Sequence, residues 1–121
     1  MSDVRIFVNM SIPDGKQEAA RTALGQLVAK VRETDDRSQT LEYDACFSPD
    51  GSSAIMLERY RDAAALGAHM QAIGDQLGAV MATVQIESLH VIGQLPDEMK
   101  AAFAQMAPRY AEVAFSLSDP S

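Results

Sequence analysis

The chain has 121 residues, 47% of them apolar and 22% charged, a balance typical of one globular domain. Seventeen Asp and Glu against ten Lys and Arg give a net charge of −7, which repels nucleic acid and anionic lipid headgroups. We therefore expect neither nucleic acid nor a membrane among its partners.

The one cysteine, Cys46, cannot form an intramolecular disulfide, and no Cys and His cluster has the spacing of a zinc site. Residues 1–5 do not resemble the start of a signal peptide, and no apolar run reaches the roughly 18 residues of a membrane span. These observations predict a cytoplasmic protein that binds no metal.

Residues 4–11 alternate between two kinds of side chain, which is the period of a β-strand. The turn sequence Pro13-Asp14-Gly15 follows it. From residue 16 to about residue 33, apolar side chains then recur at helical spacing. The segment predicts a strand followed by a long amphipathic helix.

Two further strands are expected at 41–47 and 53–60, since apolar residues such as Tyr43 and Phe47 alternate with polar ones. Pro49-Asp50-Gly51 lies between them, where proline fixes φ and glycine permits a positive φ. The two runs therefore predict a β-hairpin.

A helical segment from residue 63 to about 82, capped by Asp62 and broken near Ala72, precedes a strand at 83–92. The apolar phase of this strand shifts between Ile86 and Leu89, as happens at a β-bulge. The second half of the core is therefore expected to repeat the helix and strand of the first.

The predicted order is β-α-β-β-α-β, the ferredoxin-like arrangement, in which both helices cover one face of a four-stranded antiparallel sheet. The other face is expected to carry these side chains: Arg5, Phe7, Asn9, Met56, Glu58 and Tyr60. A partly apolar sheet face of this size would expose a larger apolar patch than monomers usually do, so a second copy is expected to pack against it. The predicted fold class is α+β, a dimeric α-β barrel.

Two more elements are expected after this core. Pro96 and Pro108 delimit a helix at 97–106, and Val113, Phe115 and Leu117 alternate as a fifth strand. The chain thus divides into a ferredoxin-like domain, residues 1–95, and a C-terminal extension, residues 96–121. The extension is expected to pack on the same domain or on the partner subunit.

Short motifs across residues 4–93 resemble the antibiotic biosynthesis monooxygenase family. They are Leu41-Glu42-Tyr43, Pro49-Asp50-Gly51, Leu57-Glu58-Arg59-Tyr60 and the helical run from Asp62 to His69. The family has Glu-x-Trp at the end of the third strand and Ala-His at the end of the next helix. Here Tyr60 stands at the tryptophan position and His69 at the histidine position.

The resemblance implies a homodimer with one pocket per subunit between sheet and helices. Some members of the family oxidise phenols or quinols with O₂ and use neither metal nor flavin. For this chain the resemblance therefore implies a small aromatic ligand and no cofactor. Another branch degrades haem. This chain shares Asn9 with that branch but has neither its tryptophan nor a ligating histidine in residues 73–81.

The candidate catalytic residues are His69, Glu58 and Tyr60. His69 titrates nearest neutrality and suits a base, while a histidine at a helix end also suits the capping of carbonyl groups. Glu58 and Tyr60 share one face of a strand, where Glu58 is either a buried base with a raised pKa or the partner of an arginine across the dimer interface. The candidate substrate-binding residues are Asn9, Phe7 and Met56.

Three functions are compatible with the sequence. The first is cofactor-independent monooxygenation of a phenol or quinol. The second is a non-catalytic ligand-binding or assembly module of the same fold. The third is an isomerase or cyclase, in which His69 or Glu58 moves a proton without O₂.

Overall fold

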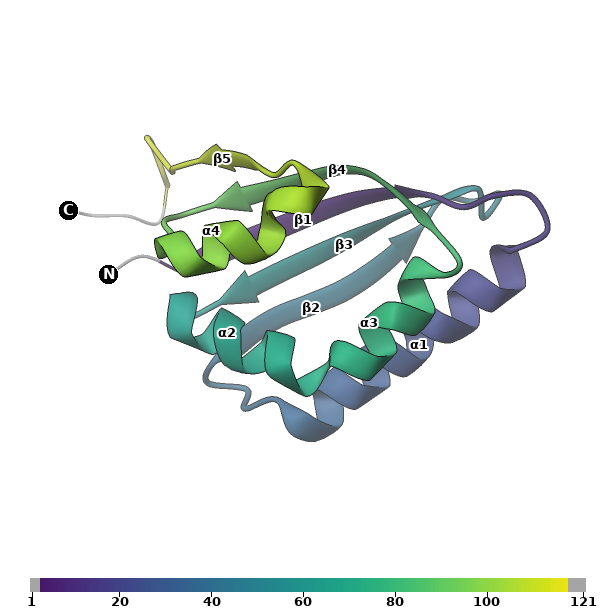
Figure 1. Ribbon diagram of the computed structural model, residues 1–121, viewed down its shortest axis with the longest axis horizontal. Helices are drawn as coiled ribbons and strands as arrows, with labels where there is room; N and C mark the ends of the chain where they lie inside the picture. The colour runs from purple at the N-terminus through teal and green to yellow at the C-terminus, as the bar shows by residue number, and fades with distance from the viewer. Residues whose placement is uncertain (1–2, 118–121) are drawn as a thin grey trace.

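A computed structural model describes residues 3–117 of the protein, and Figure 1 shows its elements in chain order. They are β1 (Val4–Ser11), α1 (Gln17–Thr34), β2 (Thr40–Phe47), β3 (Ser53–Tyr60), α2 (Ala63–Ala72), α3 (Gly74–Met81), β4 (Gln85–Ile92), α4 (Asp97–Phe103), the 3₁₀ turn η1 (Ala104–Met106) and β5 (Arg109–Ala111). The predicted α+β class and the β-α-β-β-α-β order of the core are confirmed, as is the break between α2 and α3 near Ala72.

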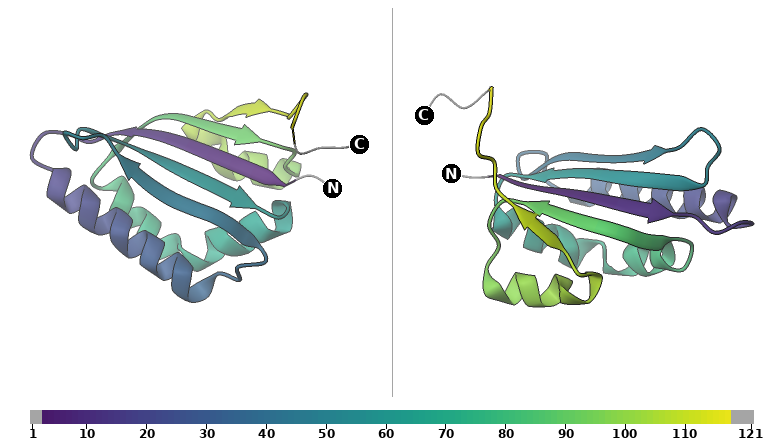
Figure 2. Two further views of the ribbon diagram at one scale, coloured as in Figure 1. Left: turned by 180° about the vertical axis from the view of Figure 1, so that it is seen from behind. Right: turned by 90° about the horizontal axis from the view of Figure 1, so that it is seen from above.

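The five strands form one sheet in the order β2-β3-β1-β4-β5, antiparallel except for β5, which runs parallel to β4. All four helices lie on one face of this sheet, as the two views of Figure 2 show. No helix or strand within residues 3–117 covers the other face. We call this uncovered side the open face.

Local sequence signals account for the helix starts and turns. The Asp62 carboxylate accepts a hydrogen bond of 2.9 Å from the backbone N–H of Ala65 and so caps α2, as predicted. In the hairpin, Gly51 has a φ of 74°, a value that favours glycine. The predicted bulge in β4 is present, because the pairing with β1 shifts between Asn9 and Met10 and leaves Glu87 unpaired.

The buried side chains form two clusters on the helix side of the sheet. One lies beneath α1 and α3 and includes Leu24, Met56 and Val80. The other lies beneath α2 and α4 and includes Leu66 and Phe103. Residues of both clusters line one cavity, which therefore lies where the two clusters meet.

The predicted content of the two sheet faces is wrong for β3. Directly opposed residues of antiparallel strands share a face, and β3 pairs with β1 so that Met56 opposes Val8, Glu58 opposes Ile6 and Tyr60 opposes Val4. Val4 and Ile6 belong to the core on the helix side, so the three β3 side chains lie on the helix side as well. Phe7 and Asn9 alternate with these β1 residues and therefore lie on the open face.

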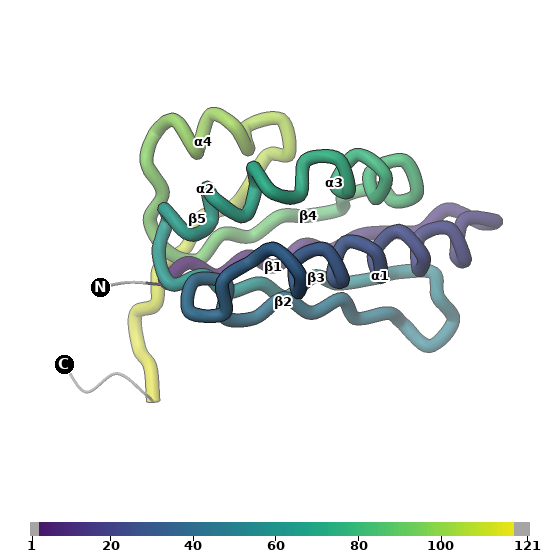
Figure 3. Tube along the Cα trace, turned by 90° about the horizontal axis from the view of Figure 1, so that it is seen from below, coloured from purple at the N-terminus to yellow at the C-terminus, as the bar shows by residue number. Residues whose placement is uncertain are grey.

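The predicted fifth strand is displaced along the chain. The strand that adds to β4 is Arg109–Ala111, whereas Val113, Phe115 and Leu117 lie outside it and are exposed. Figures 2 and 3 show the chain after β5 leaving the sheet on the side away from the helices. Val113, Phe115 and Leu117 therefore do not pair with the chain's own sheet.

Candidate functional site

His69, near the end of α2, forms a hydrogen-bonded pair with Asp35 beneath the helices. The Nδ1 atom of His69 lies 2.8 Å from Oδ2 of Asp35, and their side chains are only 1% and 5% exposed. His69 is in the last turn of α2, while Asp35 ends α1. Two helix ends thus bring together residues that are distant in the chain.

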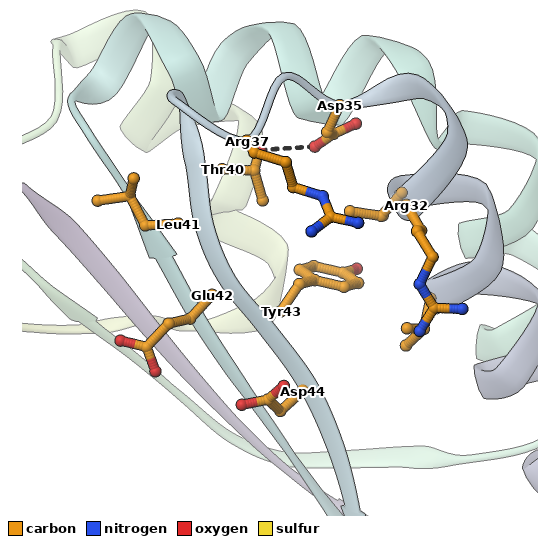
Figure 4. Close-up of a pocket in the computed structure, with 10 residues that line it drawn as sticks. Arg32, Asp35, Arg37, Thr40, Leu41, Glu42, Tyr43 and Asp44 are labelled. Atoms are coloured by element: carbon orange, nitrogen blue, oxygen red, sulfur yellow. Dashed lines mark hydrogen bonds between the residues drawn. The ribbon is translucent and has the colours of Figure 1, made fainter.

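Asp35 is held by its neighbours on both sides. Its backbone N–H donates to the carbonyl of Val31, which closes α1, and its own extended backbone turns the chain toward β2. The hydroxyl of Thr40 donates to the same Oδ2 atom at 2.7 Å, a contact drawn in Figure 4. Burial alone would raise the pKa of Asp35, but the hydrogen bonds from Thr40 and His69 outweigh it and lower that pKa. Asp35 is therefore ionised at neutral pH.

Two tyrosine rings enclose the imidazole of His69. The ring centroid of Tyr43 on β2 lies 4.8 Å from that of His69, and the centroid of Tyr60 on β3 lies 5.1 Å away. Burial, followed by the charges of Glu58 and Asp35, raises the pKa of Tyr43. Burial, followed by Glu58, does the same for Tyr60. Both phenols are therefore protonated at neutral pH.

Burial lowers the pKa of His69, although the hydrogen bond to Asp35 opposes this effect. The ring is therefore neutral near pH 7, and an ionised Asp35 accepts a hydrogen bond from Nδ1–H. The lone pair then belongs to Nε2. This atom is buried and has no hydrogen-bond partner within residues 3–117, so it is the unpaired acceptor of the imidazole.

Glu58 and Tyr60 form a second polar pair next to His69. The Tyr60 hydroxyl donates to Oε1 of Glu58 at 2.5 Å. Burial raises the pKa of Glu58 to about 7, and the hydrogen bond from Tyr60 limits that rise. Near neutral pH, Glu58 is thus present in both protonation states and can donate or accept a proton.

Tyr43, Glu58 and His69 face a cavity of about 250 Å³ between the sheet and the helices. Sixteen of its twenty lining residues are apolar, and the four polar ones are Tyr43, Glu58, His69 and Gln105. A mostly apolar cavity with a few convergent polar groups is the usual form of a small-molecule site. The arrangement suits a ligand that is apolar apart from one hydroxyl or carbonyl group.

A second hollow lies outside this cavity, between the end of α1 and β2, and Figure 4 shows it with Arg32, Arg37 and Tyr43 extending into it. Its volume is about 270 Å³, and charged residues of both signs line it. Tyr43 borders both spaces. The hollow therefore reaches the outer side of the Asp35 and His69 pair, while the acid–base groups face the inner cavity.

The structure brings together four of the residues predicted for the site. His69, Glu58 and Met56 line the inner cavity, and Tyr60 is bonded to Glu58. The expectation that Asn9 and Phe7 share this cavity is wrong, because both lie on the open face, where Asn9 donates to the Ser88 hydroxyl at 2.8 Å.

Asp35 is the residue that sequence reasoning missed. It lies in a polar loop, and its contact with His69 spans 34 positions, so no local spacing signals it. Within residues 3–117 no group of three or more His, Cys, Asp or Glu side chains could hold a metal ion. None of the helices in that range is long and apolar enough to cross a membrane.

No family model and no curated protein matches the chain. Solved structures do. MupZ from Pseudomonas fluorescens superimposes with a TM-score of 0.81 at 22% identity, over 99% of this chain and 97% of that one. Rv0793 from Mycobacterium tuberculosis gives 0.65 at 22% identity, over 78% of this chain and 97% of that one.

A protein described as an antibiotic biosynthesis monooxygenase gives a TM-score of 0.62 at 16% identity, over 77% of this chain and 99% of that one. The expected likeness in fold is confirmed: the chain has the ferredoxin-like fold of the antibiotic biosynthesis monooxygenases.

Proposed function

We propose that the protein binds a small phenol or quinol in the inner cavity and that His69 removes the proton of its hydroxyl group. The observation that carries the proposal is the buried Nε2 atom of His69, which has no hydrogen-bond partner within residues 3–117 and belongs to a residue that lines a mostly apolar cavity. A buried polar atom is costly to leave unpaired, so a bound hydroxyl that donates to it is stabilised. Asp35 stabilises the imidazolium that forms.

Glu58 and Tyr60 complete the acid–base machinery in this proposal. As the proton leaves, negative charge develops on the ligand oxygen, and protonated Glu58 can donate a hydrogen bond to it. Tyr60 holds the Glu58 carboxyl in place through its hydroxyl. The apolar walls exclude water and strengthen these interactions.

In the oxygen step that we propose, the electron-rich phenolate reacts with O₂ without a cofactor. In the reaction we propose, a phenol and O₂ give a quinone and water, so that one oxygen atom enters the ring and the other leaves as water. The oxygen step is supported by the resemblance to the antibiotic biosynthesis monooxygenases. The deprotonation step is supported by the geometry of His69, Asp35 and Glu58.

The presence of both an acid and a base on one cavity also favours a second candidate, the transfer of a proton within the ligand without O₂. Glu58 with a pKa of about 7 and neutral His69 could protonate one atom and deprotonate another. An isomerisation or a cyclisation would result. This candidate uses the same residues and differs only in its need for oxygen.

The proposal includes a homodimer formed through the open face. Phe7 and Leu57 oppose each other there, and the neighbouring Ile55 is 41% exposed. Asp3 pairs with Arg5 and Arg59 at the end of the same face. A partner sheet would bury this mixed surface.

Oxygen consumption with a panel of phenols and quinols, with and without chelator, tests the function. We expect chelator-resistant turnover that falls about 10²- to 10⁴-fold in His69→Gln, the usual range for loss of a general base. The matched control is His90→Gln, because His90 opposes Phe7 on the open face.

Turnover that persists without O₂ would favour isomerisation or cyclisation. Binding without turnover under either atmosphere would identify a non-catalytic ligand-binding module. Unchanged activity in His69→Gln would overturn the role of His69.

A further inference from the structure

The C-terminal extension forms one wall of the inner cavity. Ala102 and Phe103 line it from α4, and Gln105 and Met106 line it from η1. Phe103 is 5% exposed and belongs to the core cluster beneath α2 and α4. The wall is therefore a packed part of the molecule, although the extension comes after the ferredoxin-like core in the chain.

The wall packs against α2. A Cβ atom added to Gly67 on α2 would lie 2.8 Å from the Cε atom of Met99 on α4, the end of a flexible side chain that would then have to shift. Leu95, before α4, is also buried. Both ends of α4 are thus anchored, and its inward residues keep a defined position over the cavity.

The cavity opens to solvent between this wall and α3. Its exposed lining residues are Met81 on one side and Ala102 and Gln105 on the other. His69, by contrast, is 2% exposed. A ligand whose hydroxyl reaches His69 must therefore extend from an inner polar end toward an outer apolar opening.

The size of the cavity exceeds the need of a single ring. An apolar cavity of about 150 Å³ accommodates benzene, whereas this one measures about 250 Å³. Three methionines, Met70, Met81 and Met106, are among its lining residues. Methionine side chains are unbranched and adapt to differently shaped apolar groups.

We infer that α4 and η1 select the substrate by its apolar chain: the ring hydroxyl lies at His69, and the chain extends from the ring to the opening between α3 and the C-terminal wall. This inference rests on the proposed function and adds to it the substrate class, phenols or quinols that carry an apolar substituent. Ala102 and Gln105 are the specificity-determining positions.

Affinity should therefore rise with chain length. Burying one methylene group raises affinity about fourfold, until the chain reaches the opening. The probes are phenol, 4-ethylphenol, 4-butylphenol and 4-hexylphenol, titrated calorimetrically into the full-length protein without O₂. Binding is thus measured independently of turnover.

Ala102→Trp blocks the passage, and Ala101→Trp is its matched control. Both alanines are exposed on α4, but only Ala102 lines the cavity. We expect Ala102→Trp to abolish the gain with chain length while phenol itself still binds, and Ala101→Trp to keep the gain. Gln105→Trp and Ala104→Trp, both on η1, repeat the comparison in case the first pair does not fold.

Equal gains in the Ala102→Trp and Ala101→Trp proteins, or no gain in the unaltered protein, would overturn this inference and leave the proposed function intact. Failure of every phenol to bind would overturn both. Retained binding with no oxygen consumption would overturn the monooxygenase function alone.

Discussion

His69 Nδ1 and Asp35 Oδ2 lie 2.8 Å apart, although 34 positions separate these residues in the chain. The contact engages Nδ1 and leaves Nε2 as the ring nitrogen without a hydrogen-bond partner within residues 3–117. Thr40 donates to the same carboxylate oxygen and keeps it in place. The protonation of His69 is thus controlled by residues that lie outside the cavity lining.

Asp35→Asn should reverse the tautomer of His69. The asparagine amide can donate to Nδ1, so the ring proton moves to Nε2 and the base is lost. We expect kcat to fall about 10²- to 10⁴-fold, like the loss of the base itself. Nitrogen-15 NMR of the imidazole reports the tautomer directly. Asp36→Asn is the control, since Asp36 is exposed and bonds to Ser38; an unchanged tautomer in Asp35→Asn would contradict the prediction.

Glu58 should make the protein less stable as the pH rises. Its pKa is about 7 in the folded state and 4.5 when exposed, so between these values the folded state binds more protons than the unfolded state. Its stabilisation is complete below about pH 4.5 and is lost as the pH rises through 7. The free energy of unfolding should fall by about 3 kcal/mol over that range on account of Glu58.

Urea unfolding at pH 5 and pH 8, at one protein concentration, measures this fall in the free energy of unfolding. The Glu58→Gln protein should not show the part of the fall that Glu58 causes. Glu42→Gln, at a glutamate on the neighbouring strand with a side chain that is 53% exposed, serves as control. A difference between the unaltered protein and Glu58→Gln that does not vary with pH would refute the assignment.

The open face should hold a dimer at micromolar concentration. Light scattering is expected to give twice the 13.1 kDa mass of one chain. Ile55→Glu places a charge on that face and should give a monomer. Met81→Glu is matched in exposure, 43% against 41%, but lies on α3 on the helix side, and should remain a dimer. A monomeric unaltered protein would exclude the predicted assembly.

Removal of the residues after Glu112 should weaken the dimer without unfolding the chain. Val113, Phe115 and Leu117 are 54%, 97% and 107% exposed, so little in their own subunit depends on them. Burying each against a partner would contribute on the order of 1.5 to 3 kcal/mol.

Sedimentation compares the dissociation constants of the full-length and shortened proteins. An unchanged constant would show that the segment does not reach the partner. A cut after Leu95 is unsuitable for this test, because it would also remove the buried Phe103.

Periodicity was sufficient to predict most of the fold. The alternation in β1 and the helical spacing in α1 are strong because one face of each element is buried and the other is not. Even the bulge of β4 is visible as a phase shift at Ile86. Local patterns of this kind depend on residues that are close in the chain.

The site depended on information that is not local. Glu58 and Tyr60 were expected beside Asn9, but alternation alone does not reveal which face of β3 the helices cover. Charged residues usually mark the exposed face of a strand, so a Glu58 on the buried face makes the alternation misleading. Asp35 was missed because only the packing of α1 against α2 brings it to His69. These are the positions where burial of polar groups serves the proposed chemistry.

The short strand β5 has a consequence for how the sheet can associate. It pairs with His90, Val91 and Ile92 at one edge, and the bulge at Glu87 interrupts the rest of that edge. At the other edge, β2 has no strand beside it within residues 3–117. Pairing over the length of a full strand is thus available along one margin only, because the other margin offers just the three residues of β5. Chains that joined by strand addition at β2 would stop at a pair, because indefinite growth of a ribbon requires two receptive margins.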